Sequence, residues 1–180
     1  MSLPHAILTA LLEKPSSGLE LTRRFDRSIR YFWSATHQQI YRELRKLEES
    51  GLIHALPQTQ PSRGQKRDYE VLPAGREALT AWVAERQDPK ANRDPLLLRL
   101  RAAAVVGATG LTEEFRRHLA LHEAQLAEYL EIETRDFLRP EKTAPADRMQ
   151  HLVLRAGIAQ ERFWVEWLTA SVAELETLES

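Results

Sequence analysis

Apolar residues recur at helical spacing through most of the chain, and two short extended stretches interrupt this pattern between residues 52 and 72. Before these stretches the pattern predicts helices at 3–14, about 19–27 and 36–50. The stretches themselves predict strands at 52–56 and 66–72. A further helix is expected from Pro73 to about Arg86, with Leu79, Trp82 and Val83 facing inward.

The helix expected at 36–50 has two unlike faces. Ile40, Leu44 and Leu47 recur at helical spacing and form one buried stripe. Ser34 or Thr36 can cap its start, and Gly51 can supply the left-handed residue that ends it. The opposite face carries side chains that are long, polar or basic, namely His37, Gln38, Tyr41, Arg42 and Arg45. Taken alone, this face fits a solvated surface helix and a helix lying in the major groove of DNA equally well.

The order of the elements favours the second interpretation. Three helices followed by a two-stranded hairpin is the order of a winged helix-turn-helix domain. Residues 58–65 would form the turn of the wing and contain Arg63, and four arginines, Arg23, Arg24, Arg27 and Arg30, precede the key helix. Lysines and arginines there would contact phosphates while the helix face reads base edges.

The second half of the chain predicts a purely helical domain. Residues 87–94 are polar, contain Pro89 and indicate a linker between a domain at 1–86 and a domain at 95–180. The segment 96–106 is apolar nearly all round, so protein must cover it on several sides. Two long helices, at 112–138 and about 147–178, are expected to pair antiparallel. Because the last helix is apolar on two sides, its second side predicts contact with a second subunit in a homodimer.

Composition and charge exclude several kinds of site and divide the chain into a basic and an acidic half. The absence of cysteine excludes disulfides, thiolate metal sites and cysteine nucleophiles. The net charge is −1, but Lys+Arg outnumber Asp+Glu by 13 to 10 through Arg86 and are outnumbered by 12 to 16 after it. No apolar run is long enough for a membrane span, and the N-terminus shows the pattern of a first helix instead of a signal peptide, so a cytoplasmic protein with no membrane partner is expected.

Two side-chain groups in the second half have both a functional and a structural interpretation. Glu114, His118 and His122 are one helical turn apart, a spacing that metal ligands can use. His122 falls in the apolar seam, however, so a core or interface histidine is favoured and neither metal nor cofactor is expected. The second group is aromatic and consists of Phe163, Trp164 and Trp167. These side chains could line a pocket for a planar ligand, or they could only pack the helices together.

Several sequence motifs together resemble the DNA-binding domain of the PadR family of transcriptional regulators. They are Tyr31-Phe32-Trp33-Ser34, Gln39-Ile40-Tyr41, the run from Leu44 to Ile53, Arg63-Gly64, Lys66-Arg67-Asp68-Tyr69 and the run from Ala74 to Leu79. The two long C-terminal helices are similar in pattern to the dimerisation region of longer members. The implied fold class is mainly α: a winged helix-turn-helix domain with a two-stranded wing, followed by an α-helical antiparallel dimerisation domain.

The resemblance implies a homodimeric regulator, usually a repressor, that binds a near-palindromic operator in double-stranded DNA, and some members release DNA when an aromatic small molecule binds. It also implies that the tyrosine matching Tyr41 touches the DNA backbone. Ala35, His37 and Arg42 depart from the family pattern, so the operator sequence cannot be carried over.

These expectations predict which residues contact the bases of DNA and which contact its phosphates. His37, Gln38 and Arg42 would reach base edges from a helix capped by Thr36. Phosphates would be held by Tyr41, Arg45, Lys46, Arg63 and Lys66. No glycine-rich phosphate loop, nucleophile elbow or paired-histidine zinc motif is present, so no enzyme is expected. The alternative is a protein-interaction module, favoured by the near-neutral net charge, in which the winged domain binds a protein and not DNA.

Overall fold

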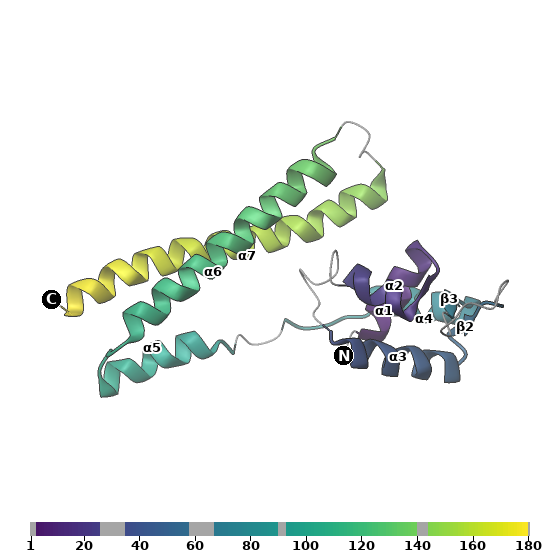
Figure 1. Ribbon diagram of the computed structural model, residues 1–180, viewed down its shortest axis with the longest axis horizontal. Helices are drawn as coiled ribbons and strands as arrows, with labels where there is room; N and C mark the ends of the chain where they lie inside the picture. The colour runs from purple at the N-terminus through teal and green to yellow at the C-terminus, as the bar shows by residue number, and fades with distance from the viewer. Residues whose placement is uncertain (1–2, 26–34, 58–66, 90–92, 140–143, 180) are drawn as a thin grey trace. The chain divides into compact units, whose positions relative to one another are not determined.

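The computed structural model describes residues 3–25, 35–57, 67–89, 93–139 and 144–179 (Figure 1). The chain divides into two compact units, Met1–Pro89 and Lys90–Ser180. It is mainly helical, with one small antiparallel sheet, and the predicted fold class is confirmed.

The first unit contains four helices and three strands within its described residues. In chain order they are α1 (Leu3–Glu13), β1 (Ser16–Ser17), α2 (Gly18–Arg24), α3 (His37–Glu49), β2 (Ile53–Ala55), β3 (Asp68–Val71) and α4 (Pro73–Val83). The sheet order is β1-β3-β2, and both pairings are antiparallel. The two-stranded wing agrees with the prediction, whereas the third strand, β1, has no counterpart among the predicted elements. Two residues are too few to show alternation, and their pairing with Tyr69 and Asp68 exists only in the folded chain.

One apolar core holds these elements together. It is formed mainly by α1, α2 and α3, and its buried members are Ile7, Leu8, Ala10, Leu11, Leu21, Phe25, Ile40, Leu44, Leu47 and Ile53. Tyr69 and Val71 of β3 share one face of the strand and pack against this core, as the two-residue period predicts. From α4, Leu79 also packs on the core, and the indole of Trp82 stacks on the His5 ring with 4.3 Å between centroids. The prediction for Val83 is wrong: it ends α4 and is 73% exposed.

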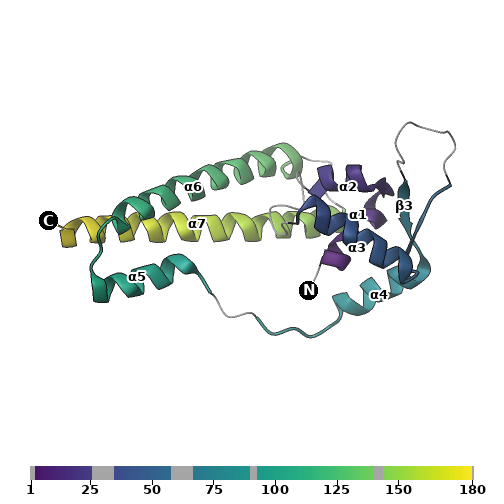
Figure 2. The same cartoon turned by 60° about the horizontal axis from the view of Figure 1, so that its bottom comes forward.

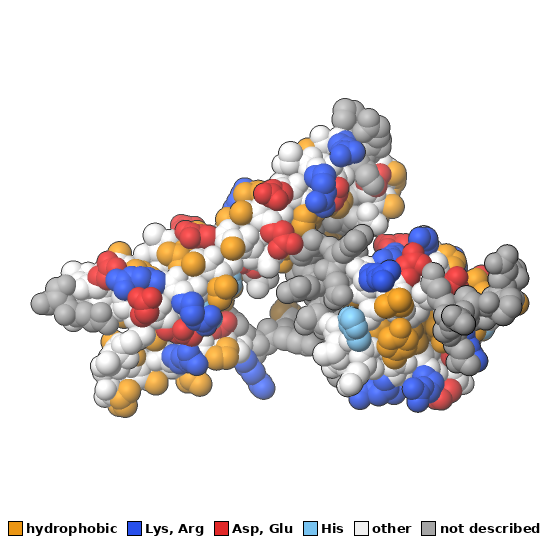
Figure 3. Space-filling view, viewed as in Figure 1, with side chains coloured by type: hydrophobic (Ala, Val, Ile, Leu, Met, Phe, Trp, Pro, Cys, Tyr) orange, Lys and Arg blue, Asp and Glu red, His pale blue; other side chains and the backbone are white. Residues whose placement is uncertain are grey.

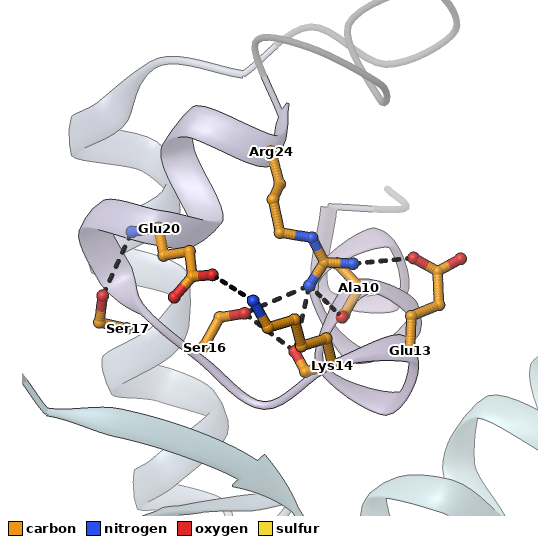
Figure 4. A network of polar contacts seen from close by, with 7 residues as sticks. All are labelled: Ala10, Glu13, Lys14, Ser16, Ser17, Glu20 and Arg24. Atoms are coloured by element: carbon orange, nitrogen blue, oxygen red, sulfur yellow. Dashed lines mark hydrogen bonds and ion pairs between the residues drawn. The ribbon is translucent and has the colours of Figure 1, made fainter. Parts of the chain in front are cut away.

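A half-buried arginine joins the first two helices (Figure 4). Nη1 of Arg24 donates to the carbonyl oxygens of Ala10 (2.7 Å) and Lys14 (3.1 Å), and its Nη2 lies 2.9 Å from Oε2 of Glu13. Helices leave their last carbonyls without internal partners, so the guanidinium satisfies the C-terminal end of α1. Arg24 belonged to the basic cluster expected beside DNA, but its guanidinium is engaged inside the unit.

The second unit is a helical assembly. It comprises α5 (Pro95–Val106), α6 (Leu111–Ile132), the short π-helix η2 (Glu133–Phe137) and α7 (Pro145–Glu179). Both views show α6 and α7 side by side and antiparallel, as predicted (Figures 1 and 2). Asp94 caps α5 by accepting from the backbone N–H of Leu96 at 2.7 Å. None of the helices in the described part of the chain combines the length and apolarity needed to cross a lipid bilayer.

The pairing of α6 with α7 has an apolar seam and polar bridges. Phe115 of α6 and Leu168 of α7 are fully buried in a cluster that also includes Trp164 and Leu175. Two part-buried histidines add polar bridges to α7: Nδ1 of His122 on α6 lies 2.6 Å from Oε2 of Glu161, and Nε2 of His151 on α7 lies 2.7 Å from Oε1 of Glu133 in η2. An unpaired buried polar group is costly, so these partners explain how the seam accepts polar residues.

Much apolar surface of this unit stays open to solvent among the described residues. On α5, Leu96 is buried and Leu100 and Ala103 pack on the cluster, whereas Val105 is 84% exposed and Leu98 and Val106 are exposed as well. On α7 the exposed large apolar residues are Met149, Leu152, Val153, Phe163 and Leu178. Both helices therefore carry one apolar face that packs inside the unit and further apolar side chains that do not.

Candidate nucleic-acid interface

The start of α3 is fixed by a reciprocal pair of hydrogen bonds. The Thr36 hydroxyl accepts from the backbone N–H of Gln39 at 3.3 Å, and Oε1 of Gln39 accepts from the backbone N–H of Thr36 at 2.8 Å. This capping box satisfies two backbone donors at the first turn and fixes where the helix begins. Thr36 therefore has a structural role, and the cap also employs Gln39, whose role the sequence analysis missed although the Thr-x-x-Gln spacing signals it.

The two faces of α3 lie as predicted. Ile40, Leu44 and Leu47 are buried in the core. The residues assigned to DNA on this helix are all exposed, namely His37, Gln38, Tyr41, Arg42, Arg45 and Lys46. The α3 face therefore presents a row of hydrogen-bond donors and positive charge to the solvent. In the space-filling view, Lys and Arg side chains gather along the edge of the first unit where α3 runs (Figure 3).

Within the described residues, this face carries an ion pair that is largely open to solvent. Nζ of Lys46 lies 3.4 Å from Oε2 of Glu43, and the lysine side chain is largely exposed, so water screens this pair strongly. Arginine offers a planar fork of donors that suits phosphates and the N7 and O6 acceptors of guanine. Glutamine can pair with adenine in the same bidentate way. The side chains present are thus of the kinds that recognise duplex DNA.

A tyrosine of β3 borders the same face. Burial raises the pKa of Tyr69, and the negative charge of Glu48 on α3 raises it further, while Arg67 and Arg45 oppose this shift. The Tyr69 phenol therefore stays protonated and keeps its hydroxyl as a donor. The Tyr69 ring also packs against the apolar core of the first unit.

Some residues assigned to DNA cannot be placed. Arg63 and Lys66, expected on the wing, lie outside the described residues, as do Arg27, Arg30 and the aromatic run at 31–33. The structure brings together the α3 residues and leaves the wing assignment as a prediction.

In the second unit the aromatic group takes part in helix packing. Trp164 is buried and stacks on the His122 ring (centroids 5.4 Å apart), and Trp167 lies 5.6 Å from Phe115. Phe163 is 56% exposed and meets Trp164 edge-on. Two members of the group thus belong to the seam and one faces outward.

Glu114 is engaged by arginines. Its carboxylate lies 2.8 Å from Nε of Arg117 and 3.0 Å from Nη1 of Arg99, and 3.3 Å from Nε2 of His118. The hydrogen bond from Arg117 is the main reason that the pKa of Glu114 falls to about 2. In the described part of the chain, no group of three or more His, Cys, Asp and Glu side chains is arranged to hold a metal ion.

Comparison with known proteins finds regulators along the whole chain. Residues 7–81 match the transcriptional regulator PadR-like family, and residues 92–176 match the C-terminal region of virulence activator alpha. The chain is 40% identical over 179 residues to the probable transcriptional regulator Rv1176c of Mycobacterium tuberculosis, covering 93% of this chain and 94% of that protein. The family and its relatives are regulators, which confirms the prediction that the protein is not an enzyme.

Solved structures are similar over nearly the full length. The Vibrio cholerae virulence activator AphA is 32% identical with a TM-score of 0.83, covering 98% of this chain and 99% of that chain. Bacillus subtilis PadR in complex with operator DNA is 27% identical with a TM-score of 0.82, covering 97% and 99%. The same Bacillus protein in complex with p-coumaric acid is 26% identical with a TM-score of 0.79, covering 98% and 99%.

Proposed function

The chain belongs to the PadR-like family of transcriptional regulators, and from this premise we propose that it is a cytoplasmic homodimeric repressor that binds a near-palindromic operator through α3. The observation that carries the proposal is the α3 face itself, where exposed donors and positive charge lie opposite a stripe anchored in the core. The operator complex of Bacillus subtilis PadR, whose chain has the same fold, supports it.

The α3 side chains divide by reach and chemistry. His37, Gln38 and Arg42 read base edges in the major groove, since they carry directional donors and acceptors near the start of the helix. Tyr41, Arg45 and Lys46 hold phosphates, and Arg63 and Lys66 do the same from the wing. In a homodimer two copies of α3 would enter successive major grooves about 34 Å apart.

The first test measures binding of the purified protein to the DNA upstream of its own coding region. We expect Arg42→Ala to weaken operator binding by about 1–3 kcal/mol and to relax the preference at one base pair of each half-site. We expect Arg45→Ala to weaken binding to all sequences alike and to reduce the slope of log K against log salt by about one for each phosphate that loses its arginine. Fluorescence anisotropy over a salt series measures both effects.

The matched control is Arg139→Ala, which removes an arginine that is likewise exposed but belongs to the second unit. Its affinity and salt slope should equal those of the wild type. If the wild type binds no promoter DNA even at low salt, the protein is not a DNA-binding regulator of this promoter, and the protein-interaction alternative is favoured. Transcription from the bound promoter with and without the protein then decides the sign, because the relatives include both a negative regulator and a virulence activator.

We further propose a small aromatic effector that binds beside Phe163, Trp164 and Trp167. The support is the exposed edge of this aromatic group and the complex of Bacillus subtilis PadR with p-coumaric acid. Aromatic ligands bind in mostly apolar pockets with a few polar groups, and the His122 ring, which is paired with Glu161, stacks on Trp164.

Isothermal titration calorimetry with p-coumaric acid tests the effector site. Phe163→Ala should weaken binding measurably, and the same compound should release the wild type from DNA. Heat of binding that is unchanged in Phe163→Ala would place the effector elsewhere, and no heat with the wild type would exclude this compound.

A further inference from the structure

The ring of Tyr41 lies directly over the first residue of α2. A Cβ atom built on Gly18 would lie 2.5 Å from Cε1 of Tyr41 and 3.1 Å from its Cζ. Real Cβ atoms do not approach other atoms at 2.5 Å, so the ring occupies the place that a side chain at position 18 would take. Gly18 is buried, while Tyr41 remains 47% exposed, so the ring is seated on one side and open to solvent on the other.

The backbone at Gly18 gives no other reason for glycine. Its φ is not positive, unlike that of Gly51, and it occupies a regular helical position directly after the N-cap residue Ser17. Glycine is among the poorest helix formers, and alanine in the same conformation is normally neutral or stabilising. The contact with Tyr41 is therefore the physical feature that this position serves.

We propose that Gly18 is a positioning residue for DNA binding, because its missing side chain seats the Tyr41 ring so that the phenol hydroxyl points at a backbone phosphate. The proposal rests on the proposed function of α3. A tyrosine side chain has only two rotatable angles before the ring, so seating the ring largely fixes the hydroxyl. Ordering the donor before DNA arrives removes part of the entropic cost of binding.

A methyl group at position 18 should displace the ring without unfolding the domain. The atoms that the new Cβ would meet belong to the far end of a flexible side chain, which can swing away. The change therefore separates the position of the ring from the stability of the fold.

The experiment is a double-mutant cycle on the full-length protein, with Gly18→Ala, Tyr41→Ala and the two combined. Affinity for the promoter fragment is measured by fluorescence anisotropy, and thermal unfolding is followed by circular dichroism. We expect Gly18→Ala to weaken DNA binding about three- to tenfold per half-site, the effect of losing one hydrogen bond. Its melting temperature should equal or exceed that of the wild type. In the Tyr41→Ala background the same substitution should cause no further loss, because the ring is already absent.

Three results would overturn the proposal. If Gly18→Ala binds the promoter as tightly as the wild type, the position of the ring does not matter for binding. The proposed function would still stand in that case, provided that the wild type binds DNA and Arg45→Ala weakens this binding. Equal losses in the presence and absence of Tyr41 would show that Gly18 acts by another route. A wild type that binds no DNA would reject the positioning role together with the proposed function.

Discussion

At the scale of single residues, two glycines of the first unit differ in the atoms that an added side chain would meet. The missing side chain of Gly18 leaves room for the flexible end of a tyrosine, whereas that of Gly75 leaves room for backbone. A Cβ on Gly75 would lie 2.3 Å from the carbonyl oxygen of Leu52 and 2.8 Å from Cγ1 of Val71. That carbonyl accepts a hydrogen bond from the backbone N–H of Leu72 at 3.0 Å, so it is held where the next helix begins. Gly75 lets α4 lie against the strand region.

We predict that Gly75→Ala destabilises the first unit by about 1–3 kcal/mol, the usual cost of forcing extra volume into a packed site. Hydrogen exchange of the buried amides of α1 measures the free energy of unfolding of this unit without contributions from the second. Gly18→Ala is the comparison variant and should change this free energy little, since only a side chain must move. An equally stable Gly75→Ala protein would mean that α4 can shift at little cost.

At the scale of elements, α7 is a helix with two apolar faces that meet different neighbours. Leu154, Ile158, Trp164, Leu168 and Leu175 are buried toward the rest of the second unit. The exposed apolar residues Met149, Leu152, Ala156, Ala159 and Phe163 follow one another at a spacing of three or four on the other side. An isolated exposed apolar residue needs no explanation, but a continuous stripe along a helix indicates an interaction surface. This stripe supports the proposed homodimer.

We predict that Met149→Glu combined with Leu152→Glu converts the proposed dimer into a monomer, because two negative charges would be buried without partners in the interface. Sedimentation equilibrium should give about twice 20.7 kDa for the wild type and 20.7 kDa for the variant. Thr169→Glu adds one such charge at an exposed position away from the stripe and should remain dimeric. A monomeric wild type would contradict the proposed dimer, and a dimeric double variant would place the interface on other residues.

At the scale of the whole molecule, the excess of positive charge belongs to the first half of the chain and the excess of negative charge to the second. The net charge of −1 hides this division, and for that reason overall composition did not identify a DNA-binding protein. The distribution of charge along the chain is more informative, because a phosphate interacts mainly with charges within about a Debye length of 8–10 Å. The motifs that resemble the PadR family lie in the basic half, and membership of the chain in that family confirms the resemblance.

The sequence by itself determined the order of the helices and of the two wing strands, the buried stripe of α3 and the antiparallel pair of long helices. Each of these follows from spacing along one segment, which the chain carries before it folds. It also determined that the exposed face of α3 would be rich in donors, because the buried stripe leaves only the opposite face.

Tertiary structure alone decided the features that depend on distant segments. Ser16 and Ser17 became a strand only through pairing with β3, and Val83 became exposed because α4 ends there without a covering neighbour among the described residues. Arg24 left the expected DNA surface to satisfy the carbonyls at the end of α1, and the space above Gly18 came to hold a tyrosine from another helix. Hydrogen-bond satisfaction and close packing act between atoms that only the folded chain brings together, so local spacing could not reveal them.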